Sequence, residues 1–233
     1  MRRQKPRFKR IIGIFGIFSI FVLIACSAKA PPPPPQPEAP GGPIHIKKLL
    51  VIPFQNMTGV YGENTTVQCR LCGNVFTTGK VEKGAEEMLG DHVASLLKHR
   101  KDLEFIPENQ AEGVLSTILS GETVKLPERE LMAKVGFSLD ADAVLAGKVY
   151  RFSERDGTGF SAKSPASVAF ELDLIRVSDG RVIWNGHFDE TQKSLFENLF
   201  QWNTFWQRKG MWITAEQLAT EGLNRIFETF PVQ

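Results

Sequence analysis

The chain has 233 residues, 42% of them hydrophobic and 23% charged, which is enough apolar material for one well-buried domain. Its 28 Lys and Arg against 26 Asp and Glu give a net charge of +2, but six of the basic residues fall within the first ten positions. Without those six the balance is 22 to 26, or −4, so the slight basicity gives no reason to expect a nucleic-acid partner, and none is predicted.

Residues 1–25 have the layout of a secretory signal, with six basic residues followed by a 15-residue apolar run at 11–25. As a helix this run measures about 22 Å, short for the ~30 Å core of a bilayer, so a cleaved signal fits better than a permanent span. It ends in Leu23-Ile24-Ala25-Cys26, which resembles the lipobox of bacterial lipoproteins. The resemblance implies that Cys26 receives acyl chains such as palmitate and becomes the first mature residue. An ordinary signal peptide and an uncleaved anchor are the alternatives.

Residues 26–43 are predicted to be the lipidated cysteine and a proline-rich tether. Five consecutive prolines at 31–35 favour extended polyproline II, and at ~3.1 Å per residue about 17 residues reach on the order of 50 Å. Ser27 follows the cysteine, and in the lipoproteins that the lipobox resembles a serine there accompanies sorting to the outer membrane. The resemblance implies a lipid-anchored protein on the periplasmic face of the outer membrane.

Residues 44–233 are predicted to form one α/β domain, because short apolar runs typical of strands alternate with segments of helical periodicity. Asp179-Gly180 indicates a hairpin turn, and Thr214 with Gln217 forms a capping box that opens the last helix. The expected strands cover 48–54, 103–106, 141–150, 166–177 and 181–190, and the expected helices cover 83–99, 111–119, 127–136, 195–212 and the segment after 214.

Cys69 and Cys72 lie in a long polar segment, residues 55–82, that is predicted to be a loop. One Cys-x-x-Cys pair supplies two of the four ligands of a structural zinc site, and the four histidines are scattered without ligand spacing. Gly73 stands where c-type haem attachment needs histidine, and a redox motif is expected at a strand–helix junction. The pair is thus interpreted as a disulfide or two reduced thiols, as a metal-binding pair, within one chain or shared between two, or as a redox pair. No cofactor and no metal are assigned.

Aromatic residues crowd the segment 195–212. As a helix it has an apolar arc of more than half its circumference, wider than packing against one core requires. Three interpretations are open. The segment is a helix buried deep in the domain, a helix that packs inward and exposes aromatic side chains to a partner, or a membrane-inserted helix. The candidates for partner contact are Trp202, Phe205, Trp206 and Trp212.

Three stretches carry a resemblance to a known family: 49–54 with Asn56 and Thr58, 139–147, and 179–184. They are similar to the opening strand, the helix-to-strand junction and the hairpin turn of a family that includes the TolB amino-terminal domain, the CsgG-type curli-secretion lipoproteins and the lipoprotein activators of penicillin-binding proteins. The resemblance implies a single mixed β-sheet with flanking helices and carries no functional residue over to this chain.

No nucleophile elbow, zinc-protease, P-loop or dinucleotide motif is present, so an enzyme is not predicted. The predicted function is that of a non-catalytic envelope lipoprotein, an adaptor or activator in outer-membrane or cell-wall assembly or secretion. Its expected partners are the membrane and an envelope protein or the peptidoglycan machinery. The alternative is a subunit of an oligomeric CsgG-like outer-membrane pore, with the segments 145–154 and 166–177 as lipid-facing strands.

Overall fold

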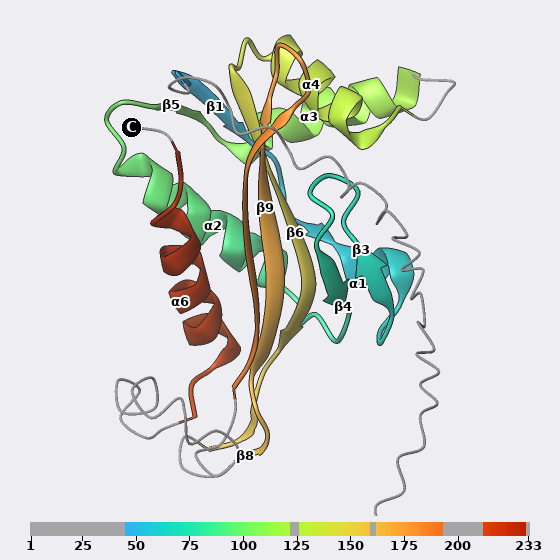
Figure 1. Cartoon of the computed structure of the whole chain (residues 1–233), viewed down its shortest axis with the longest axis vertical. Helices are drawn as coiled ribbons and strands as arrows, with labels where there is room; N and C mark the ends of the chain where they lie inside the picture. The colour runs from blue at the N-terminus through green and yellow to red at the C-terminus, as the bar shows by residue number, and fades with distance from the viewer. Residues whose placement is uncertain (1–44, 122–125, 159–161, 193–211, 232–233) are drawn as a thin grey trace, which may run out of the picture. The chain divides into compact units, whose positions relative to one another are not determined.

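The structure is a computed structural model that describes residues 45–121, 126–158, 162–192 and 212–231. Its centre is a six-stranded mixed sheet in the order β10-β9-β6-β1-β5, with β2 paired to β6 (Figure 1). The parallel strands are β1 (Lys48–Val51), β2 (Gln55–Asn56), β5 (Glu104–Ile106) and β6 (Ala143–Ser153). The antiparallel strands are β9 (Ser167–Arg176) and β10 (Val182–Thr191). The predicted α/β class with a single mixed sheet is confirmed.

Alternation along the strands gives the sheet two distinct faces. On the first face, Leu145, Phe170 and Leu172 pack with the apolar sides of α2 (Ala85–Lys98) and α6 (Ala215–Phe227), which lie side by side (Figure 1). Helix α6 begins with the predicted capping box, in which the Thr214 side chain accepts from the Gln217 N–H and the Gln217 side chain accepts from the Thr214 N–H.

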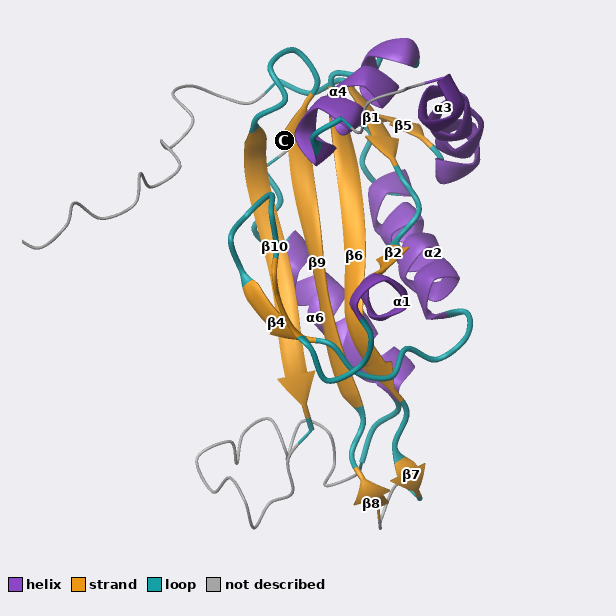
Figure 2. Cartoon of the chain, turned by 90° about the vertical axis from the view of Figure 1, so that its right-hand side faces the viewer, coloured by secondary structure: helices purple, strands orange, loops and turns teal. Residues whose placement is uncertain are grey.

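The second face is covered by α3 (Glu108–Gly121), α4 (Glu128–Ser138) and the segment 57–77 (Figure 2). That segment holds α1 (Met57–Tyr61) and a hairpin of β3 (Thr66–Gln68) and β4 (Val75–Thr77), so the prediction of a loop over 55–82 is wrong. The reason is packing. Val67 and Phe76 face the sheet, and the Phe76 ring stacks on that of Tyr150 at 4.1 Å between centroids.

The hairpin that joins β9 and β10 turns at Asp179-Gly180 as predicted. Gly180 has φ +66°, a left-handed conformation that glycine adopts without cost, and the Asp179 carboxylate accepts from Arg176. A short ribbon of β7 (Asp156–Gly157) and β8 (Ala162–Ser164) extends the far end of β6 and β9 (Figure 2).

Strands β6 and β9 contain the two segments predicted to face lipid in the pore alternative. Both are interior strands, each paired on both sides, and nearly all their side chains are buried under helices on one face or the second-face elements on the other. A lipid-facing band on these strands is not compatible with this packing.

Several predicted features lie outside the described residues. These are the leader and tether, residues 1–43, and residues 195–211 of the aromatic segment. Their boundaries and roles stay predictions. Among the helices that the structure describes, none combines the length and the hydrophobicity needed to cross a membrane.

The contact between α6 and the sheet predicts the effect of one glycine substitution. A Cβ added at Gly222 would lie 2.7 Å from the ring of buried Phe188, so Gly222→Ala is expected to lower the free energy of unfolding by about 1–3 kcal/mol. Gly113→Ala in α3 is the matched control. Nothing lies within 4 Å of its added Cβ, and the better helix propensity of alanine is expected to stabilise by about 0.5–1 kcal/mol. Urea denaturation measures both changes. Equal changes in the free energy of unfolding for Gly222→Ala and Gly113→Ala would contradict the close packing of α6 against the sheet.

Candidate functional site

The turn between β3 and β4 positions the two cysteines. The backbone N–H groups of Leu71 and Cys72 both donate to the Cys69 Sγ, at 3.3 Å and 3.4 Å, and the Gly73 N–H donates to the Cys69 carbonyl at 3.0 Å. Gly73 closes the turn with φ +84°. Two amide dipoles aimed at one sulfur favour its thiolate form. Both thiols are free, and Cys69 is buried.

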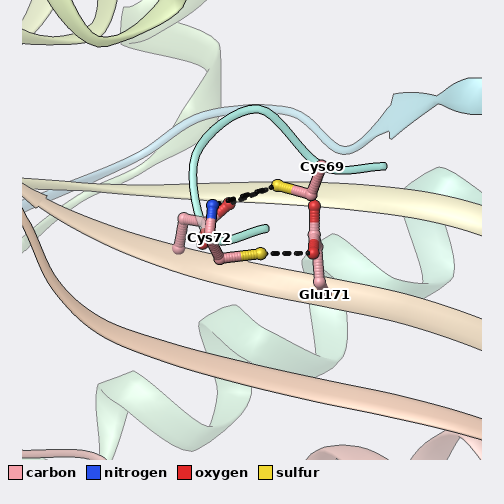
Figure 3. A group of neighbouring side chains, drawn as sticks. Cys69, Cys72 and Glu171 are labelled. Atoms are coloured by element: carbon pink, nitrogen blue, oxygen red, sulfur yellow. Dashed lines mark hydrogen bonds between the residues drawn. The ribbon is translucent and has the colours of Figure 1, made fainter. Parts of the chain in front are cut away.

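Two carboxylates of the sheet face this turn. Glu171 and Asp173 are two residues apart on β9, so both point to the second face, and both are fully buried. The Cys72 Sγ donates to the Glu171 Oε2 at 3.1 Å, and the Cys69 Sγ lies 3.9 Å from the Asp173 Oδ2 (Figure 3 shows the two cysteines and Glu171). One donor atom from each of the four residues lies within 4.8 Å of all the others. We call these four residues the thiol–carboxylate cluster.

Three further side chains hold the cluster in place. The Tyr150 hydroxyl donates to the Glu171 Oε1 at 2.6 Å, and the Asn185 Nδ2 donates to the Asp173 Oδ1 at 2.8 Å. Each carboxylate therefore has one oxygen engaged by the protein and the other turned toward the sulfurs. Buried Lys148 pairs with Glu128 at 2.7 Å and lies 3.7 Å from the Cys69 Sγ.

Burial governs the acidities of the cluster. It raises the pKa of Asp173 to about 7, helped by the nearby charge of Glu171. Burial likewise raises the pKa of Glu171 to about 7. The interaction with the Cys72 thiol lowers the pKa of Cys69 to about 5, and Lys148 contributes to that shift. Burial by itself would lower the pKa of Lys148, but the charge of Glu128 and its hydrogen bond to the lysine outweigh burial. The pKa of Lys148 is therefore raised above its usual value. The lysine therefore stays charged, and the cluster binds or releases protons near neutral pH.

The raised pKa of Asp173 predicts a pH effect on stability. Between about pH 4 and pH 7 the folded chain holds a proton on Asp173 that the unfolded chain has lost, so this residue makes the fold less stable as pH rises through that window. Asp173→Asn removes the penalty. With a chelator present, its stability relative to the wild type is expected to rise from pH 4 to pH 7, by on the order of 3 kcal/mol.

Asp179→Asn is the control for that measurement. The hydrogen bond from Arg176 lowers the pKa of Asp179, so the control is expected to lose stability relative to the wild type as pH rises, and only slightly because the pair is exposed. Urea unfolding at several pH values checks both variants. A pH-independent difference between Asp173→Asn and the wild type would contradict the raised pKa.

An apolar pocket of about 900 Å³ lies next to the cluster. Its walls come from α1, α3, α4, the β3–β4 turn and β6. Cys69 of the cluster lines this pocket, and so do Lys148 and Tyr150, which hold the cluster in place. Five large hydrophobic side chains are exposed in the described part of the chain, and three of them, Val60, Tyr61 and Leu119, line this pocket. The other two are Val75 and Phe137.

The predicted site residues are distributed as follows. Cys69 and Cys72 come together, whereas Cys26, Trp202, Phe205 and Trp206 lie outside the described residues. Trp212 is half-buried, and its carbonyl accepts a hydrogen bond from Arg155.

The sequence analysis missed Glu171, Asp173 and Lys148 as parts of a site. Their signal was present, because charged residues at alternate positions of two neighbouring strands share one face. Such a pattern is equally typical of a face exposed to solvent, and only the hairpin that covers it makes the difference.

No protein-family model and no curated protein matches the sequence. Partial structural similarity exists to a PelC dodecamer from Paraburkholderia phytofirmans, at 15% identity and a TM-score of 0.45, covering 84% of this chain and 94% of that one. The LpoB C-terminal domain from Escherichia coli is similar at 14% identity and a TM-score of 0.36, and the match covers 64% of this chain and 86% of that one. Lipoprotein GNA1162 from Neisseria meningitidis is similar at 17% identity and a TM-score of 0.39, and the match covers 70% of this chain and 99% of that one. All three TM-scores lie below 0.5.

Proposed function

We propose that the chain is a lipid-anchored protein of the bacterial cell envelope whose α/β head is a non-catalytic adaptor. The anchor is Cys26, and residues 27–43 are the tether. In this proposal the head holds a partner protein of the envelope by an apolar segment of that partner, which enters the pocket between α1, α3 and α4. The observation that carries the proposal is the gathering of Val60, Tyr61 and Leu119 at this pocket.

Exposed apolar side chains that gather around one concavity are typical of binding surfaces, whereas single exposed ones are ordinary. Leu119 is 57% exposed and Val60 is 56% exposed, and they come from helices far apart in the sequence that converge on the same pocket. Arg70, an exposed residue of the β3–β4 turn that also lines the pocket, adds a positive charge there. A partner segment with apolar side chains and an acidic residue is complementary to this surface.

Crosslinking in cells tests the proposal. A photoreactive residue at position 119 is expected to attach to one defined envelope protein, and the same residue at position 137 is not. Phe137 is the matched control, because it is 80% exposed and apolar but does not line the pocket. A second variant, Val60→Ser, is expected to reduce the crosslink from position 119 at least several-fold, because it removes apolar surface that α1 contributes to the same pocket.

Two outcomes would count against this proposal. Crosslinks from 119 back to this same chain would mean that one of its own segments fills the pocket. Equal crosslinking from 119 and 137 would mean that the capture reflects exposure and not the pocket.

A further inference from the structure

The thiol–carboxylate cluster has a donor set that no part of the adaptor proposal uses. Cys69 and Cys72 come from the β3–β4 turn, and Glu171 and Asp173 come from β9. All four belong to one chain, so no second copy is needed to complete four ligands. We propose that these four side chains bind one zinc ion, which fastens the β3–β4 hairpin to the sheet.

Charge is the first argument. Two thiolates and two carboxylates carry four negative charges, and Lys148 is the one cation within 4 Å of them in the described residues. Its ammonium is already engaged with Glu128 at 2.7 Å. Anions buried without compensation cost several kcal/mol each, so this arrangement needs protons or a metal cation to balance it. A divalent ion among the four donor atoms supplies two further positive charges where they are needed.

Geometry is the second argument. Zinc bonds of 2.0–2.3 Å in a tetrahedron hold ligand atoms roughly 3.3–3.8 Å apart. The Cys72 Sγ lies 3.1 Å from the Glu171 Oε2, the Cys69 Sγ lies 3.9 Å from the Asp173 Oδ2, and no pair exceeds 4.8 Å. Side-chain shifts of about 1 Å therefore bring all four atoms onto one ion. The buried position also keeps water from competing for the ligands.

The surroundings are the third argument. Metal-bound carboxylates are held by hydrogen bonds on the oxygen that the metal does not take. Tyr150 holds the Glu171 Oε1 and Asn185 holds the Asp173 Oδ1, which leaves Oε2 and Oδ2 toward the sulfurs. The amides of Leu71 and Cys72 stabilise the Cys69 thiolate in the same way.

A disulfide between the two cysteines fits these surroundings less well. It would remove the Cys72 hydrogen that Glu171 accepts and leave two buried carboxylates facing an uncharged bridge. Mixed sulfur and oxygen ligands suit zinc, whose filled d shell imposes no other geometry. On binding, every proton that the four ligand groups hold passes to solvent, each of the four donor atoms forms a bond to zinc, and no electron moves.

Elemental analysis of the full-length protein, purified from membranes in detergent without chelator, tests the proposal. The wild type is expected to carry about one zinc per chain. Cys72→Ser, Glu171→Gln and Asp173→Asn are expected to reduce this at least tenfold, and the surface variant Glu82→Gln to leave it unchanged. Tyr150→Phe keeps all four ligands and is expected to weaken the affinity for added Zn²⁺ by about 10–100-fold.

A second measurement needs only the wild type. After treatment with a chelator and a reductant, added Zn²⁺ is expected to slow alkylation of both Cys69 and Cys72, and further chelator is expected to restore it. Co²⁺ in place of zinc is expected to give thiolate-to-cobalt charge-transfer absorption. A chain whose reduced thiols neither bind Zn²⁺ nor gain protection from it overturns the proposal, and so does a Cys69–Cys72 disulfide in protein isolated from cells.

Discussion

Replacing Cys26 by alanine is expected to abolish fatty-acid attachment and to leave the precursor uncleaved. In the lipoprotein proposal the sulfur of Cys26 is the atom that carries lipid, and alanine has no group to take its place. Each methylene of an acyl chain contributes about 0.8 kcal/mol to membrane binding, so the loss removes the anchor of the mature protein. Metabolic labelling with a fatty-acid analogue and the electrophoretic size of the product measure the two effects.

Two variants serve as controls for that experiment. Cys69→Ser and Cys72→Ser alter the other two cysteines of the chain, which lie in the folded domain, and both are expected to be labelled and cleaved like the wild type. Normal processing of Cys26→Ala would refute the lipobox assignment and with it the envelope location.

Lys148→Met is expected to lower the free energy of unfolding by about 3–5 kcal/mol. Methionine keeps much of the apolar stem but removes the ammonium, which lies 2.7 Å from the Glu128 carboxylate and less than 4 Å from those of buried Glu171 and Asp173. Breaking a buried ion pair costs this much because the remaining charges stay buried without a partner. Urea denaturation at neutral pH in the presence of a chelator measures the change.

Lys80→Met is the matched control for Lys148. Lys80 also pairs with a glutamate, Glu82, at 2.7 Å, but its side chain is 61% exposed against 4% for Lys148. The control is therefore expected to cost far less than Lys148→Met, because water screens an exposed pair. Adding Glu171→Gln and Asp173→Asn to Lys148→Met is expected to recover part of the loss, because the buried negative charges are then gone. Equal losses for the two lysine variants would contradict the buried-charge account.

Local patterns predicted most of the secondary structure. Apolar runs and helical periodicity located α2, β5 and the β9–β10 hairpin to within a few residues. Each of these elements buries one face, and the spacing of apolar residues along the chain reflects that buried face. Helix α4 continues to Ser138, two residues past the end predicted at Gly136. That glycine is buried within the helix, where a Cβ would meet Val144 and Val177.

The hairpin over residues 66–77 was missed for a physical reason. Its strands are three residues each, too short for alternation to stand out, and their stability comes from contact with Tyr150 and Ala169 on the sheet. A contact between residues so far apart in the chain leaves no local trace in the sequence.

The sequence by itself determined the alternation of strands and helices, because it depends on neighbouring residues alone. The leader, the tether and the lipobox rest on the same kind of local pattern and stay predictions. Only the tertiary structure decided what Cys69 and Cys72 face. The pairing of β9 with β6 and the cover of the hairpin bring Glu171, Asp173 and Lys148 to the two sulfurs across about 80–100 residues of chain. These charged residues would be typical of a solvent-exposed strand face, but here they are buried, and burial raises the pKa of Glu171 and Asp173 to about 7.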